Sequence, residues 1–178
     1  MIESMALRLA QRLKNAEPEG TASVEVMKYS LVILLNLFFT ILVIGLAGAI
    51  TGKFGQTMLG LAAFMVLKFV SGGAHLRTAL QCSVLSVVCV VAVPHIPLTD
   101  TWTQAVIAVS AVLLLLFAPS NLKGHTRIPD RYFPLLKLAS VFIVSLNFFW
   151  LSSTVAVAHF IQAASTIRIN RRRLKNEA

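Results

Sequence analysis

Long apolar runs alternate with short polar segments along most of this chain. The first run, residues 29–50, has no charged side chain and reaches the ~20 apolar residues that cross a bilayer as a helix. Segments rich in glycine, proline or charge interrupt the pattern and mark helix ends. The pattern predicts six transmembrane helices, at residues 29–50, 55–70, 79–93, 103–118, 133–150 and 153–167. The predicted fold class is all-α: a polytopic transmembrane helical bundle of about six spans.

The N-terminal segment has a different, amphipathic pattern. Its apolar residues recur at helical spacing with basic residues between them. The apolar set is Ile2, Met5, Ala6, Leu9 and Leu13, and the basic set is Arg8, Arg12 and Lys14. Such a helix either lies on the membrane surface or packs against the inner face of the protein, and the pattern leaves both open. We assign residues 1–20 to an interfacial amphipathic helix that ends at Glu17–Gly20.

The last apolar region, residues 138–167, is ambiguous, because it fits one over-long helix or a hairpin that turns near residues 151–153. Charge favours the hairpin. With six spans and a cytoplasmic N-terminus, every Lys and Arg except Lys53 falls inside, fifteen of the sixteen, as the positive-inside rule requires. We therefore predict a single integral membrane domain over residues 1–178. Its core is residues 29–167, residues 168–178 form a basic cytoplasmic tail, and both termini are cytoplasmic.

Composition narrows the classes of protein that fit. The chain is 57% hydrophobic and 13% charged, against ~25% charged residues in soluble domains, which leaves no room for a separate soluble catalytic domain. In so apolar a chain the net charge of +9 indicates contact with anionic membrane lipids rather than nucleic acid. Cys82 and Cys89 are too few for a disulfide framework.

The pair His75 and Cys82 is the main candidate for chemistry. An imidazole can take the proton of a thiol, and the thiolate then attacks a carbonyl carbon. Cys82 falls at the predicted start of a span, near Lys68 and Arg77, a setting that favours the thiolate form. The alternative is a packing cysteine and an interfacial loop histidine. On one straight helix the two side chains would be ~10.5 Å apart, so the pair requires a backbone break, which we expect between Gly72 and Cys82.

The remaining cysteine and histidines suggest no further chemistry. We expect Cys89 to pack in the core and His159 to make a polar contact between spans. No pair of residues has metal-ligand spacing such as H-x-x-x-H or C-x-x-C. The predictions are therefore no metal and no cofactor.

The loop of residues 123–137 is strongly basic. Its cations either set topology and contact lipid headgroups, or they bind an acidic peptide. The second hypothesis makes Lys123, Arg127 and Arg131 substrate-binding residues. Gln81, next to the cysteine, is a candidate donor to an oxyanion.

The whole chain resembles the accessory gene regulator B (AgrB) family of membrane cysteine endopeptidases in peptide quorum sensing. The resemblance rests on size, about six spans, the basic amphipathic N-terminus and the motif Gly73-x-His75-x6-Cys82. Ala118-Pro119, followed by a basic loop that ends in Ile128-Pro129, is also similar.

The resemblance implies that His75 and Cys82 are catalytic, and that the enzyme cuts an AgrD-like propeptide before its acidic C-terminal tail. Cleavage leaves a thioester on the cysteine, and a peptide side chain then closes a cyclic autoinducing peptide. Family members have a basic residue and a glycine upstream of the histidine. Here these are Lys68, where arginine is common, and Gly73, and the resemblance makes both of them expected substrate-binding residues. The resemblance also implies a homodimer in the cell membrane.

Two other classes of protein use the same spans. A small transporter or peptide exporter would treat His75 as a pathway residue, but it should carry charges near the membrane midplane, and here the charges lie at the edges. A scaffold for a sensor kinase is the third class.

Overall fold

The computed structural model describes residues 2–73, 78–120 and 129–167, which form α-helices and one isolated β-bridge. The α-helices are α1 (Ile2–Ala16), α2 (Val24–Ile50), α3 (Phe54–Ser71), α4 (Ala79–Ala92), α5 (Asp100–Phe117), α6 (Phe133–Ser145) and α7 (Ser153–Ser165). Short 3-10 helices are η1 (Val93–His95), η2 (Asp130–Tyr132) and η3 (Leu146–Phe148). A helix lies in each predicted span and in the predicted amphipathic segment, so the all-α prediction is confirmed.

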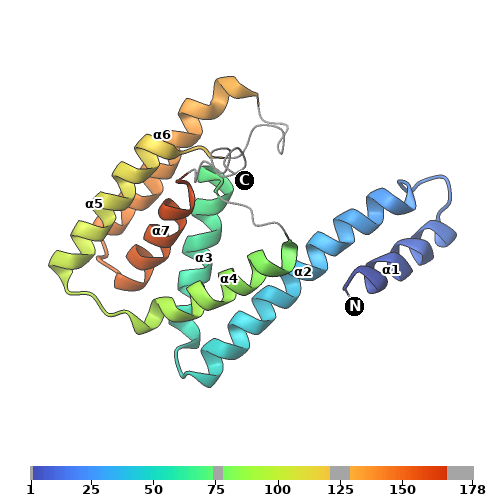
Figure 1. Cartoon of the computed structure of the whole chain (residues 1–178), viewed down its shortest axis with the longest axis horizontal. Coiled ribbons are helices and arrows are strands. Elements are labelled where there is room, and N and C mark those ends of the chain that lie inside the picture. The colour runs from blue at the N-terminus through green and yellow to red at the C-terminus, as the bar shows by residue number, and fades with distance from the viewer. Residues whose placement is uncertain (1, 74–77, 121–128, 168–178) are drawn as a thin grey trace, which may run out of the picture.

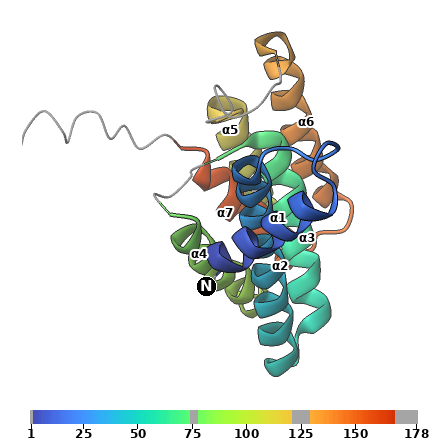
Figure 2. The ribbon, with the colours of Figure 1, turned by 90° about the vertical axis from the view of Figure 1, so that its right-hand side faces the viewer.

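Helix α7 lies between α3 and α5 and packs against both, while α6 covers α5 and α3. On the other side α2 packs on α3 and α4, and α1 runs beside the N-terminal part of α2 (Figures 1 and 2). One buried apolar cluster consists of Ile44, Leu61, Phe64, Val90, Val93, Val157 and Ala158. A second consists of Leu67, Ile107, Leu114, Ala118, Val144, Ala156 and Ala163. Because α3 and α7 contribute to both clusters, they form the framework on which the segment after α3 is fixed.

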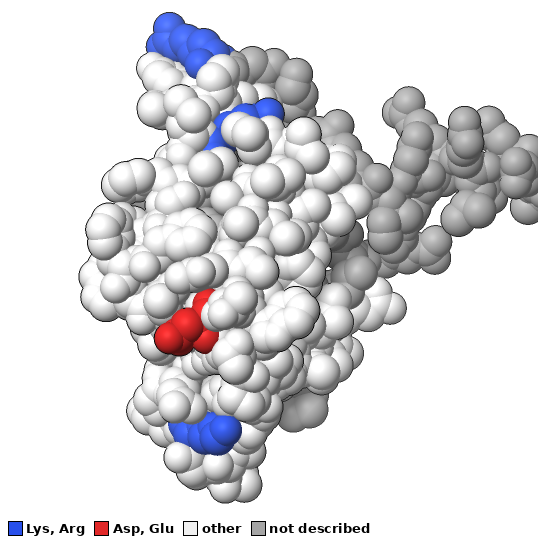
Figure 3. All heavy atoms as spheres, turned by 90° about the vertical axis from the view of Figure 1, so that its left-hand side faces the viewer, with Lys and Arg blue, Asp and Glu red and all other residues white. Residues whose placement is uncertain are grey.

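The outer surface of the bundle is apolar. Among the described residues, three helices, α2, α3 and α5, are long and apolar enough to cross a membrane, and shorter apolar helices occupy residues 80–95 and 133–148. Large side chains such as Ile50, Phe69 and Trp150 are mostly exposed, as lipid-facing residues are. Figure 3 shows a broad band without charged side chains between blue groups at the top and red and blue groups near the bottom. The chain is a helical membrane protein, and the number of six spans stays a prediction.

The last apolar region folds as two helices, as the charge distribution predicted. The chain turns at Leu151, whose φ of 47° is rare for a residue with a side chain. Asn147 closes the turn, since its Nδ2 donates to the Ser152 carbonyl oxygen (3.0 Å) and its Oδ1 accepts from the Ser152 N–H (3.2 Å). The Ser152 hydroxyl then caps α7 by accepting from the Val155 N–H (3.4 Å).

Helix α1 presents small residues to α2. Ala6 and Ala10 are fully buried, whereas Met5, Leu9 and Leu13 remain largely exposed. The Lys14 ammonium donates to the carbonyl oxygens of Pro18 and Thr21, which ties the end of α1 to the turn before α2. The helix is therefore both packed on the protein and still amphipathic on its outer surface.

Two glycines of α2 should respond oppositely to alanine substitution. A Cβ at Gly48 would lie 2.9 Å from Thr57 on α3, whereas a Cβ at Gly45 would have no neighbour closer than 3.7 Å. We expect Gly48→Ala to lower the free energy of unfolding by about 1–2 kcal/mol through overpacking. Gly45→Ala should leave it unchanged or raise it by up to about 1 kcal/mol, because alanine favours helix. Unfolding of both variants in detergent tests this, and equal shifts would contradict the close α2–α3 contact.

Candidate active site

The helical structure is interrupted between α3 and α4, where a working His75–Cys82 pair would require an interruption. Helix α3 ends at Ser71, and the next two residues, Gly72 and Gly73, have φ of 69° and 142°. Helix α4 begins only at Ala79, after an extended Thr78 whose hydroxyl caps the helix by accepting from the Gln81 N–H (3.2 Å). The predicted break is confirmed. His75 lies outside the described residues, as does Arg77.

Cys82 lies in the first turns of α4, as predicted. Its backbone N–H donates to the Thr78 carbonyl oxygen (3.2 Å), the first hydrogen bond of the helix. Its side chain is half-buried and is a free thiol, like that of Cys89. A half-buried thiol at a helix N-terminus is open to a reactant and at the same time held by the helix.

The Cys82 thiol lines a cavity of about 630 Å³ between α2, α3 and α4. Gly72, two residues before the undescribed segment 74–77, and Thr78, directly after it, line the same cavity. Most of the wall is apolar, and Asn36, Thr40, Lys68, Ser83 and Ser86 supply polar groups. This cavity could accept a mainly apolar stretch of peptide beside the sulfur.

Two polar groups of the cavity have defined contacts. Asn36 of α2 donates from Nδ2 to the hydroxyl of Ser83 on α4 (2.7 Å). Ser83 directly follows Cys82 in the sequence. Lys68 is the one charged residue among the described cavity residues, and its ammonium lies 5.3 Å from the centre of the Phe64 ring. The predicted substrate-binding residue Lys68 is thus in the cavity that holds Cys82.

Gly73 occupies a position that only glycine fits. Besides its positive φ, an added Cβ would lie 2.7 Å from Ser165 Oγ and 3.1 Å from Gln162 Nε2, both on α7. Its N–H donates to the Ser120 carbonyl oxygen (3.1 Å). The structure therefore gives Gly73 a backbone role, and its predicted part in substrate binding stays a prediction.

The other predicted substrate residues lie apart from the cavity or outside the described residues. The Gln81 side chain is exposed and is not among those that line the cavity, so its oxyanion role stays a prediction. Arg131 is exposed in η2, donates to the Tyr132 hydroxyl (3.0 Å) and lies 4.8 Å from the centre of that ring. Lys123 and Arg127 are outside the described residues.

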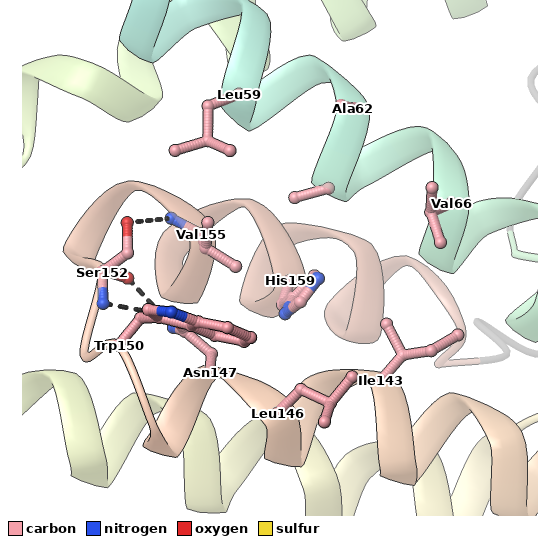
Figure 4. Close-up of a pocket in the computed structure, with 11 residues that line it drawn as sticks. Leu59, Ala62, Val66, Ile143, Leu146, Asn147, Trp150, Ser152, Val155 and His159 are labelled. Atoms are coloured by element: carbon pink, nitrogen blue, oxygen red, sulfur yellow. Dashed lines mark hydrogen bonds between the residues drawn. The ribbon is translucent and has the colours of Figure 1, made fainter.

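A second cavity, of about 510 Å³, lies between α3, α6, η3 and α7. Figure 4 shows the His159 side chain between α3 and α6, with Leu59, Ile143 and Val155 among the side chains around it. His159 is 4% exposed, and its Nδ1 has no hydrogen-bond partner among the residues that the structure describes. The expected polar contact between spans is thus not found for this nitrogen.

His159→Leu should therefore not weaken the protein. An unpaired buried polar group costs about 1–3 kcal/mol, so we expect an unchanged or higher unfolding temperature in detergent. Asn147→Leu, which removes two hydrogen bonds at the end of the same cavity, should lower that temperature. A clear loss of stability in His159→Leu would show that the imidazole has a partner after all.

Within the described ranges, no group of three or more His, Cys, Asp or Glu side chains could hold a metal ion. Sequence reasoning overlooked Asn36 and Gln162, two side-chain amides at the cavity and at the segment after α3. Each stands inside an apolar run, and an amide in a transmembrane segment needs a buried partner. A single amide side chain inside an apolar run was therefore the sequence feature that could have identified both residues.

The sequence was compared with protein families, with curated proteins and with solved structures. A model of the family described as "Accessory gene regulator B" matches residues 3–169. A "Putative AgrB-like protein" of Halalkalibacterium halodurans is 30% identical over 115 residues, which is 65% of this chain and 58% of the relative. The "Accessory gene regulator protein B" of Staphylococcus intermedius is 28% identical over 152 residues, 82% of this chain and 77% of the relative. The chain thus spans less than two thirds of the first relative's length. No solved structure matches.

Proposed function

Because the chain belongs to the accessory gene regulator B family, we propose that it is a membrane cysteine endopeptidase of a quorum-sensing system. Its substrate is an AgrD-like propeptide, cut before an acidic C-terminal tail. Cys82 is the nucleophile and His75 the general base. The product leads to a cyclic autoinducing peptide.

One observation carries this proposal: the cavity that Cys82 lines is also lined by residues on either side of the segment that contains His75. Gly72 and Thr78 line that cavity. His75 follows Gly73 by two residues, and two extended residues span at most ~7 Å. Cys82 follows Thr78 by four helical residues, a rise of ~6 Å. His75 also precedes Thr78 by only three residues, at most ~11 Å of extended chain, so covalent connectivity permits the imidazole to reach this cavity.

The chemistry needs two acyl transfers. In the first, His75 takes the Cys82 proton, the sulfur attacks the scissile carbonyl carbon, and the tail's amide nitrogen leaves with that proton. The N-terminal part of the peptide remains as a thioester on Cys82. In the second, a thiol or hydroxyl of the peptide gives its proton to His75 and attacks the thioester. The ring closes, and the Cys82 thiolate is released and takes back the proton.

The membrane arrangement belongs to the same proposal. Six spans with both termini in the cytoplasm place Lys68, Cys82 and the basic loop at the cytoplasmic edge, where a newly made propeptide is available. Membrane lipids surround the bundle, and a second copy of the chain completes a homodimer.

The test is cleavage of the short peptide with an internal cysteine or serine and an acidic tail that a neighbouring reading frame would encode. Vesicles containing the protein should release the tail, with the masses of tail and remaining peptide showing one cut. Blocking the thiols with N-ethylmaleimide should stop release. No release in intact vesicles, or full release after blocking, would overturn the proposal.

The acidic tail should bind the basic loop electrostatically. Replacing Lys123, Arg127 and Arg131 together by glutamine should weaken peptide binding about tenfold at low salt, since each exposed ion pair contributes ~0.5 kcal/mol. The difference should shrink at high salt, because ions screen the attraction. Lys53→Gln is the control, as its ammonium donates to the Pro94 carbonyl oxygen at the opposite end of α3. Equal affinity of all three proteins at low salt would assign the loop to lipid headgroups.

A further inference from the structure

The segment that follows α3 is held by a side chain of α7. Gln162 of α7 is completely buried, and its Nε2 donates to Ser71 Oγ (3.0 Å) and to the Gly72 carbonyl oxygen (2.5 Å). Its Oε1 accepts a hydrogen bond from Ser165 Oγ (3.2 Å). Both donor hydrogens of the amide are therefore in use, while its oxygen shares the single Ser165 hydroxyl hydrogen with the Gln162 carbonyl oxygen (2.7 Å).

Backbone hydrogen bonds hold the same segment from its other side. The Gly73 N–H donates to the Ser120 carbonyl oxygen (3.1 Å), and the Ser120 N–H donates to the Ser71 carbonyl oxygen (3.0 Å). These bonds form the isolated parallel bridge between Gly72 and Ser120. Residues 71–73 are thus clamped between Ser120 and Gln162, where the C-terminal ends of α3 and α7 lie side by side (Figure 1).

The contacts of Ser120 and Gln162 with residues 71–73, here called the clamp, lie directly before two segments that contain residues of the proposed site. Residue 73 leads directly into the segment that contains His75, and Ser120 leads into the one that contains Lys123 and Arg127. On the other side, Gly72 lines the Cys82 cavity. Gln162 itself is not among the residues that line this cavity.

Packing alone does not account for a glutamine at this position. An amide in an apolar interior is costly unless its hydrogen bonds are made, and an apolar side chain of the same size would have no such requirement. Polar side chains inside membrane segments concentrate at functional positions. Here the amide reaches from α7 to residues 90 and 91 positions earlier in the chain.

We propose that Gln162 is a positioning residue of the enzyme: it fixes the backbone of Gly72 and Gly73 so that His75 is presented to the Cys82 thiol. This inference rests on the proposed function, because it assigns Gln162 a task only if His75 and Cys82 react together. Gln162 acts through the backbone and takes no part in bond making.

The experiment uses Gln162→Met, which keeps the size of the side chain but has no donor. In a Cys89→Ala background Cys82 is the only cysteine, so the rate of alkylation by iodoacetamide reports its reactivity without any peptide. We expect this rate to fall about tenfold, to the value found for His75→Ala, with no further fall in the double variant. For propeptide cleavage, kcat should fall at least about tenfold while KM stays within about twofold. Gln104→Met, the same change at an exposed position of α5, should change neither.

The alternative is a purely structural glutamine. In that case Gln162→Met would change the unfolding temperature but neither kcat nor the alkylation rate, or its effect would add to that of His75→Ala. Either result overturns the inference. If the methionine variant does not fold, Gln162→Asn takes its place with the same expectations, because its shorter side chain keeps the amide but does not reach the Gly72 carbonyl oxygen. Failure of the proposed function is distinct: His75→Ala and Cys82→Ala would then both cleave normally.

Discussion

Replacing Cys82 by alanine is expected to lower the rate of propeptide cleavage by at least about a thousandfold, because the substitution removes the proposed nucleophile. The thiol lies in the first turns of α4, half-buried, in the cavity that Gly72 and Thr78 also line. The substitution removes one sulfur atom from a half-buried site, so the fold should persist. Cleavage in membranes with matched amounts of protein measures the effect.

Cys89→Ala is the matched control for that substitution. Cys89 lies on the same helix and is also half-buried, but it is not among the residues that line the Cys82 cavity. We expect its rate of cleavage to stay within about twofold of the unchanged protein. Full activity of Cys82→Ala, or loss of activity in Cys89→Ala at equal folding, would end the assignment of the nucleophile.

Gly73→Ala should have the second largest effect, lowering the free energy of unfolding by about 2–4 kcal/mol and cleavage at least tenfold. A positive φ costs a residue with a Cβ about 1–3 kcal/mol, and here the Cβ would also lie 2.7 Å from Ser165 Oγ. The clamp that Gln162 and Ser120 make around this segment would have to shift. Unfolding in detergent and cleavage in vesicles measure the two effects.

Two other glycines separate the causes of that loss. Gly52 also has a positive φ, 69°, but an added Cβ would meet nothing within 4 Å, so Gly52→Ala should show the backbone cost alone. Gly55 has open space and no positive φ, so Gly55→Ala should be neutral. If Gly73→Ala matched Gly55→Ala in stability, the close contact between the segment after α3 and helix α7 would be wrong.

The helices could be predicted because each depends on local pattern. A run without charge, residues 29–50, is sufficient to specify most of α2, and the amphipathic spacing of the first residues specifies α1. The turn at residues 151–153 has no glycine or proline, so local chemistry did not reveal it. It was predicted from the positive-inside rule, which acts on the whole chain.

The contacts between helices could not be predicted from the sequence. The Gln162 amide meets Ser71 across 91 positions, and the Asn36–Ser83 pair spans 47. Periodicity shows which face of a helix is apolar, but not which partner that face meets. For the same reason the sequence suggested a polar contact for His159 that its Nδ1 does not make among the described residues.

The most direct test of the central claim is capture of the acyl-enzyme. Protein in vesicles is mixed with propeptide, quenched in acid within the first turnover, digested and measured by mass spectrometry. We predict that the segment containing Cys82 carries the N-terminal part of the peptide through a thioester that hydroxylamine removes, and that this adduct is reduced in His75→Ala. Release of the tail with no adduct on Cys82, or with the adduct on Cys89, would contradict the account.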